Sequence, residues 1–127
     1  MVNFWPIVFG HWMADYLLQP KKMAVEKAGN WKVCLLHCLI YALSVGGWYA
    51  LVDPKKMVLV AFLAFASHFP IDYWSLASEW LKLIKGRNVM DAFKKENPDP
   101  FAAFVYAVVD NGMHLALLYL AMQFLTS

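Results

Sequence analysis

The stretch FAAFVYAVVDNGMHLALLYLAMQFL, residues 101–125, is apolar along almost its whole length, and its only titratable acid and histidine are Asp110 and His114. It exceeds the ~20 apolar residues that an α-helix needs to cross a bilayer core. Because 61% of the residues are hydrophobic and only 16% are charged, the composition indicates an integral membrane protein. We therefore predict one all-α domain over residues 1–127, an integral membrane four-helix bundle. The three other predicted spans are residues 2–19, 33–52 and 57–74.

The basic residues are distributed unevenly between the connections. Lys55 and Lys56 alone lie between the second and third stretches, and no Lys or Arg lies beyond the outer spans. Since positively charged loops stay in the cytoplasm, we expect both termini outside. The net charge of +2 then reflects a rim that faces lipid headgroups. Membrane lipid is the expected partner, nucleic acid is not, and a homo-oligomer is compatible with the pattern. The other cations are Lys21, Lys22, Lys27 and Lys32 in the first connection, and Lys82, Lys85, Arg87, Lys94 and Lys95 in the third.

The third apolar stretch has two unusual features. Pro70 lies in its middle, which predicts a kink. It continues into SLASEWLKLIK, residues 75–85, where apolar and polar side chains recur at helical spacing. Such a pattern is typical of an amphipathic helix at a membrane surface, so we predict a cytoplasmic extension of the third helix.

Two cysteines, Cys34 and Cys38, are four residues apart in the second span. This spacing within a helix is poor geometry for a disulfide, and the cytoplasmic side is reducing. We interpret them as small packing residues. A thiolate pair for a soft metal, on either side of His37, is the alternative.

Seven ionisable side chains lie inside the apolar stretches, although each membrane-embedded Asp costs ~2.5–3.5 kcal/mol on insertion scales. Pairing, water or a bound metal has to offset that cost. His–Asp pairs four residues apart recur in three stretches, and four residues apart means one helix face. In the first and third stretches His precedes Asp, whereas in the last stretch Asp precedes His. Because the predicted topology has the last stretch running outward and the other two inward, each Asp lies one turn nearer the cytoplasm than its His. The pattern predicts one shared cluster, made of His11, Asp15, His37, His68, Asp72, Asp110 and His114.

Imidazole and carboxylate groups together bind Zn, Mn or Fe, so we predict a site for divalent transition metal, with two ions, held by these seven residues. Asp15 or Asp110 could instead act as a general base. Gln19, Lys27 and Asn111 are candidates to support the ligands or to contact substrate. The competing interpretation is a dry network of Asp–His pairs that relays protons or ions.

The motifs resemble a family of small bacterial membrane proteins known as a domain of unknown function, whose members open with H-x-x-A-D-F-x-x-Q. The sequence departs from this pattern at Tyr16, where Phe is commoner, and at Asn111, where Gln is expected. The resemblance covers nearly the whole chain and implies a multi-pass protein of the bacterial inner (cytoplasmic) membrane. The matching residues are His11, Ala14, Asp15, Tyr16 and Gln19, then Lys27, Leu35 with His37, His68 with Asp72 and Tyr73, and Asp110 with His114.

More distantly, the His and Asp pattern is similar to that of membrane-bound metal-dependent hydrolases. That resemblance implies metal binding more directly than it implies hydrolysis. The leading hypothesis is a membrane-embedded metal-dependent hydrolase that acts on a lipid or lipid-linked phosphoester at the cytoplasmic side. One alternative is a metal-ion or proton-conducting transporter or channel subunit that uses the same cluster. The other is a non-catalytic membrane protein whose cluster fixes helix packing.

Overall fold

The computed structural model describes residues 2–86, 96 and 98–126, and in these residues every regular element is a helix. This confirms the all-α prediction. Arg87, Lys94 and Lys95, which contribute to the predicted charge bias, lie outside the described residues. The elements are α1 (Phe4–Trp12), the π-helical turn η1 (Met13–Leu17), α2 (Lys21–Glu26), α3 (Trp31–Ala50), the short 3₁₀ turn η2 (Pro54–Lys56), α4 (Met57–Tyr73), α5 (Leu76–Lys85) and α6 (Pro100–Thr126).

Three helical segments are long and apolar enough to cross a membrane: Trp31–Ala50, Pro54–Tyr73 and Pro100–Leu125. They correspond to the second, third and fourth predicted spans. The first predicted span, residues 2–19, forms a shorter rod, because α1 and η1 end at Leu17 and Pro20 has an extended backbone. Residues 4–17 rise roughly 20 Å, less than a full bilayer core.

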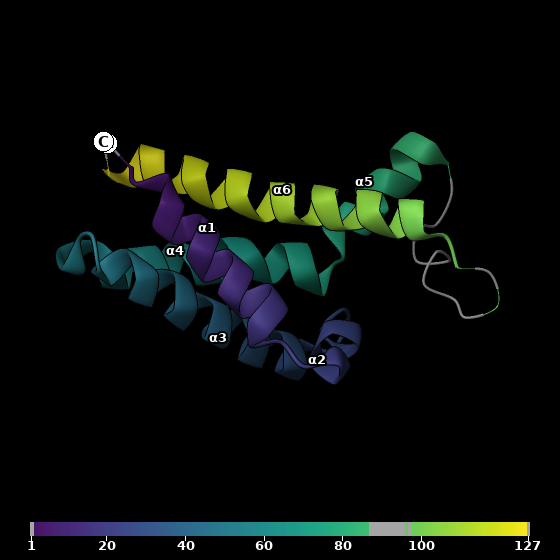
Figure 1. The fold of residues 1–127 in the computed structure, drawn as a ribbon, viewed down its shortest axis with the longest axis horizontal. Coiled ribbons are helices and arrows are strands. Elements are labelled where there is room, and N and C mark those ends of the chain that lie inside the picture. The colour runs from purple at the N-terminus through teal and green to yellow at the C-terminus, as the bar shows by residue number, and fades with distance from the viewer. Residues whose placement is uncertain (1, 87–95, 97, 127) are drawn as a thin grey trace.

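The helices pack side by side, with α1 lying across α3 and close to α6 (Figure 1). The start of α1 and the end of α6 lie at one end of the bundle, and α2, α5 and the start of α6 lie at the other (Figure 1). The chain therefore has one end with the start of α1, the end of α6 and the α3–α4 turn, and one end with α2, α5 and the start of α6 (Figure 1).

Glycines set the close approach of helices in the half that carries the termini. A Cβ atom at Gly10 would lie 2.6 Å from the Cα atom of Val45 in α3. A Cβ atom at Gly46 would lie 2.9 Å from the Cβ atom of Ala61 in α4. Since real Cβ atoms do not come this close, only glycine allows these backbones to touch. Around these contacts lies a core of buried apolar side chains, which includes Ile7, Val45, Tyr49, Val60, Leu63, Leu118 and Met122.

The break in the third predicted helix comes after Pro70. Helix α4 continues through Pro70 to Tyr73, and the chain then turns at Ser75, whose φ of 50° is left-handed. Helix α5 follows, as predicted for the amphipathic extension. Its Ala77 and Leu81 are buried, whereas Trp80, Leu83 and Ile84 are exposed.

Candidate functional site

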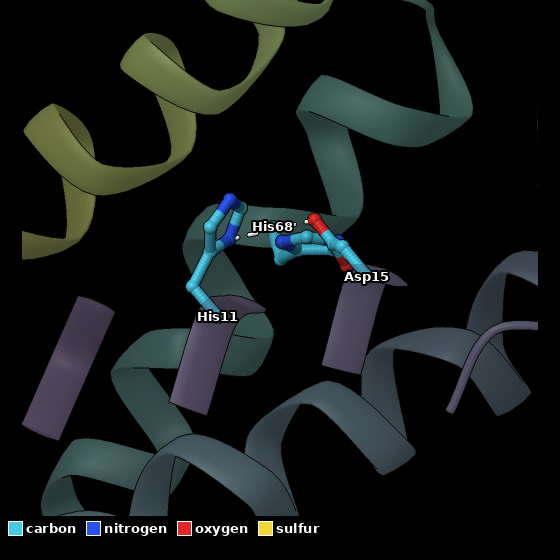
Figure 2. Close-up of side chains that lie close together, drawn as sticks. All are labelled: His11, Asp15 and His68. Atoms are coloured by element: carbon cyan, nitrogen blue, oxygen red, sulfur yellow. Dashed lines mark ion pairs between the residues drawn. The ribbon is translucent and has the colours of Figure 1, made fainter. Parts of the chain in front are cut away.

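The structure brings all seven predicted His and Asp side chains together at one level of the bundle. The four imidazoles of His11, His37, His68 and His114 are buried. Figure 2 shows His11 and Asp15 on the first helix pointing toward His68 of α4. Three overlapping sets of ligand atoms each lie within 4.8 Å: His11 with Asp15 and His68, His37 with His68 and Asp72, and Asp72 with Asp110 and His114.

Four atoms at the centre of the cluster face one another: Nε2 of His37, Nε2 of His68, Oδ1 of Asp15 and Oδ2 of Asp72. The two nitrogens are 2.9 Å apart. His37 Nε2 lies 3.2 Å from each of the two oxygens. His68 Nε2 lies 3.0 Å from Asp72 and 3.7 Å from Asp15. Two donor atoms bound at ~2.0–2.1 Å to one tetrahedral ion are about 3.3 Å apart, so these spacings fit a single metal position.

Asp72 has a second oxygen that points elsewhere. Its Oδ1 lies 3.4 Å from Nε2 of His114. The other nitrogen of that ring, Nδ1, donates a hydrogen bond of 2.8 Å to the backbone carbonyl of Asp110. Because Nδ1 carries the proton, Nε2 of His114 keeps its lone pair toward Asp72, which is the usual arrangement of a metal-binding histidine.

Asp15 also divides its oxygens between two neighbours. Its Oδ2 lies 3.4 Å from Nδ1 of His11. The Nε2 of His11 donates to Oδ1 of Asn111 at 2.6 Å. Asn111 in turn donates to the hydroxyl of Tyr16 and to the backbone carbonyl of Ala107. The predicted supporting role of Asn111 thus has a structural basis, because its amide fixes the orientation of the His11 ring.

Tyr41 is a member of the site that the sequence interpretation missed. Its buried hydroxyl lies 3.1 Å from Nδ1 of His11, and its ring stacks on that of His68 with 3.7 Å between centroids. The signal was present, since Tyr41 follows His37 by four residues and so shares its helix face.

Lys27 reaches the cluster from the connection between α2 and α3. Its Nζ lies 2.7 Å from Oδ2 of Asp72, and its side chain is only 13% exposed. Burial alone would lower the pKa of Lys27, but the carboxylates of Asp72 and Asp15 outweigh burial and raise it, so the ammonium stays charged. A backbone hydrogen bond of 3.1 Å, from Gly29 N–H to the Tyr73 carbonyl, ties this connection to the end of α4.

The π-helical turn η1 presents Asp15 and leads to Gln19. In this turn the N–H of Leu18 donates to the carbonyl of Met13, five residues back. Gln19 donates from its amide nitrogen to the carbonyl of Asp15 at 3.4 Å, and its Oε1 is buried with no hydrogen-bond partner. π-turns of this kind are frequent at functional sites.

A cavity of about 220 Å³ adjoins the cluster between η1 and α6. Asp110, with a side chain 18% exposed, lies between this cavity and the buried groups. The cavity connects the deep cluster with the surface of the bundle. Its polar lining comes from Asp15, Tyr16, Gln19, Lys27, Tyr106, Asp110 and Asn111.

The two cysteines are free and buried, as predicted, and their Sγ atoms are 3.9 Å apart. Neither belongs to the three sets of ligand atoms found among the described residues. The geometry therefore favours the packing interpretation over a thiolate pair.

The chain matches one protein-family model over residues 4–127, and the description of that family is "Protein of unknown function (DUF3307)". No curated protein and no solved structure matches the chain. The match extends over α1 through α6 and so includes every residue of the cluster.

Proposed function

The chain belongs to this family, whose description gives no activity, and we propose that it is a membrane-embedded metal-dependent hydrolase that cleaves a phosphoester. The substrate is a lipid or lipid-linked molecule, and the reaction takes place at the cytoplasmic side. The observation that carries the proposal is the convergence of four donor atoms. Nε2 of His37 and Nε2 of His68 lie 2.9 Å from each other and 3.0–3.7 Å from Oδ1 of Asp15 and Oδ2 of Asp72.

The charge of the cluster supports a bound cation. Three carboxylates, those of Asp15, Asp72 and Asp110, meet a single described ammonium, that of Lys27. With neutral imidazoles, two negative charges lack a counter-ion in a nearly closed space. Uncompensated charge in such surroundings is costly. One divalent ion would balance the two negative charges, and a second would leave positive charge for an anionic substrate.

The buried atoms that lack hydrogen bonds also fit this donor set. They include Asp15 Oδ1 and His114 Nε2, two of the atoms that face the proposed ion positions. Buried polar atoms normally have a hydrogen-bond partner, so these two favour a ligand-binding role. We assign one ion to His37, His68, Asp15 and Asp72, and a second to Asp72, His114 and Asp110, with His11 next to Asp15.

The residues around the ions have separate tasks in the proposed reaction. A divalent transition metal, Zn, Mn or Fe, would acidify a water molecule and stabilise the charge that develops on the ester oxygens. Asp110 borders the cavity and is the aspartate that could act as the general base instead of as a ligand, because both oxygens of Asp15 already face histidines. Lys27 would attract the anionic group, and Asn111 would hold His11 in place.

We further propose that α1 with η1 forms a short fourth membrane helix, so that the bundle has four helices with both termini outside the cytoplasm. Support comes from the placement of both termini and the α3–α4 turn at one end of the molecule (Figure 1). Lys21, Lys22 and Lys27 lie at the opposite end, as a cytoplasmic side requires. The proposed location is the bacterial inner membrane, with lipid as the partner; a homo-oligomer is compatible with this arrangement.

Elemental analysis of the detergent-purified protein tests the proposal. We expect one to three equivalents of a transition metal in the wild type and a loss of most of it in Asp72→Asn. Asp53→Asn is the matched control. Asp53 lies in the α3–α4 turn, about four helical turns from His37 and from His68, and pairs with Lys56. Folded wild-type protein that takes up no metal would exclude the hydrolase. Weakly held metal with ion flux in liposomes would favour the transporter.

A further inference from the structure

The cavity beside the cluster lies where two elements of the bundle do not pack closely. Among the described residues, no Cα atom of η1 comes within 8 Å of a Cα atom of α6. The two elements are joined instead by side chains, through the hydrogen bond between Asn111 and Tyr16. The cavity of about 220 Å³ occupies this place.

The inner end of the cavity carries charge suited to a phosphate. Lys27 lines it, and its ammonium nitrogen lies 2.7 Å from Oδ2 of Asp72. Gln19 adds a buried Oε1 without a hydrogen-bond partner, which can accept from a hydroxyl. The carboxylates of Asp15 and Asp110 would repel an anion, so the phosphate requires the proposed ions as well as Lys27.

The wall of the cavity farther from the cluster is largely apolar and includes two small side chains. Helix α6 contributes the small side chains of Ala103 and Ala107, which are one turn apart, together with the larger ring of Tyr106. Tyr16 lines the cavity and is 55% exposed, and Phe104, next to Ala103, is 66% exposed. Small side chains flanked by exposed aromatic ones leave room for an acyl chain against α6.

The cavity lies against the first three turns of α6. Residues 103–111 lie roughly 5–16 Å from the start of α6 at Pro100, given 1.5 Å of rise per residue. For a helix that begins at the membrane surface, this range extends from the headgroup region into the adjacent hydrocarbon. Lys27 and Gln19 lie outside the three long apolar helices, next to α2 in the sequence.

We propose that this cavity binds the phosphate group of a membrane lipid, which enters sideways from the bilayer between η1 and α6, with its acyl chain along Ala103 and Ala107. This inference rests on the proposed function, whose substrate it places. The Asn111–Tyr16 hydrogen bond crosses the entrance and has to open or move when the lipid enters.

Calorimetric titration of the zinc-loaded protein in an uncharged detergent tests the inference. The probes are dioctanoyl phosphatidic acid, inorganic phosphate, and dioctanoylglycerol, which lacks the phosphate. We expect the phosphatidic acid to bind at least tenfold more tightly than either of the others. Chelation of the zinc should abolish that preference.

Two alanine substitutions on α6 form a matched pair. Ala107→Leu fills the wall of the cavity and should weaken phosphatidic acid binding at least tenfold, with little effect on inorganic phosphate. Ala116→Leu changes an exposed alanine of the same helix, away from the cavity, and should leave binding unchanged. Lys27→Gln should weaken both phosphate ligands.

Three results would overturn the inference. They are equal affinity for phosphatidic acid and dioctanoylglycerol, equal affinity for phosphatidic acid and inorganic phosphate, and equal effects of the two alanine variants. The zinc content of the same samples separates the two proposals. Protein that holds zinc without preferring the phosphorylated lipid retains the metal centre and loses only the lipid site, whereas protein without zinc loses the proposed function itself.

Discussion

The same helices build two halves of the bundle that differ in chemistry. In the half that carries the termini, α3 contributes Val45 and Tyr49 to an apolar core. One to three turns earlier, the same helix contributes His37 and Tyr41 to the polar cluster. Glycine contacts bring the backbones together in the first half, whereas ion pairs and hydrogen bonds connect the helices in the second.

This difference indicates where stability and function reside. Close packing of apolar side chains and glycines stabilises membrane helix bundles through dispersion and close backbone contact. Buried charges pay a desolvation cost that their mutual attraction offsets only in part. We infer that the apolar half supplies most of the stability of the fold. The polar half is retained for its chemistry despite its cost in stability, a separation of roles common at functional sites.

The largest loss of stability is expected from Gly10→Leu in the apolar half. A Cβ atom there would lie 2.6 Å from the Cα and 3.0 Å from the N of Val45, and a helix backbone cannot move aside locally. We expect a loss of at least about 3 kcal/mol in the free energy of unfolding. Thermal unfolding in detergent, or the yield of monodisperse protein, measures it.

Gly47→Leu is the control for that substitution, because a Cβ atom at Gly47 meets nothing within 4 Å. Its effect should stay within ~0.5 kcal/mol. If both variants unfolded equally, close glycine packing would not be the source of stability in this half.

A smaller effect is expected from Lys27→Met in the polar half. The change leaves Asp72 without the ammonium that lies 2.7 Å away. Removal of one partner from a buried pair costs about 3–5 kcal/mol, and we expect about 2 kcal/mol here because Lys27 keeps some contact with solvent. Thermal unfolding of the metal-free protein checks the value.

Added zinc should restore more stability to Lys27→Met than it adds to the wild type, because the ion replaces the missing positive charge. An equal gain in both proteins would argue against metal binding at Asp72.

The smallest effect on stability is expected from Asp110→Asn. Asp110 has no cationic partner among the described residues except the ring of His114, at 3.7 Å, and it lies near two other carboxylates. Removal of its charge should leave metal-free protein as stable as the wild type, or up to about 1 kcal/mol more stable. Hydrolysis of a phosphoester by metal-loaded protein should nevertheless fall at least a hundredfold if Asp110 is the base. Marked destabilisation of metal-free protein by this change would indicate a packing role instead.

Much of the site could be predicted because its pairs are local. His11 with Asp15, His68 with Asp72, and Asp110 with His114 are each four residues apart, and α-helical spacing alone puts such pairs on one face. Their reversed order in the last helix predicted a common level, and the structure brings all seven residues together.

Contacts between segments far apart in the sequence could not be predicted from residue spacing, because they depend on how each helix is rotated about its own axis. The bond from His11 to Asn111 crosses from the first helix to the last. Lys27 reaches Asp72 only because α2 turns the chain back and Gly29 bonds to Tyr73. The break at Ser75 was missed for another reason, since Pro70 is the residue that composition marks as a helix breaker.

Because of the π-helical turn η1, the number of residues between Gly10 and Asp15 cannot change without misplacing one of these two residues. A turn of this kind is what results when one residue is inserted into an α-helix, so a deletion within Met13–Leu17 would restore the regular ladder. It would also rotate everything on one side of the turn by about 100° relative to the other side. Gly10 then could not face Val45 while Asp15 faced His37. Homologous chains should therefore accept substitutions at the exposed positions of this segment but not single-residue deletions, and any such deletion that persists in evolution should be accompanied by an insertion between Gly10 and Asp15.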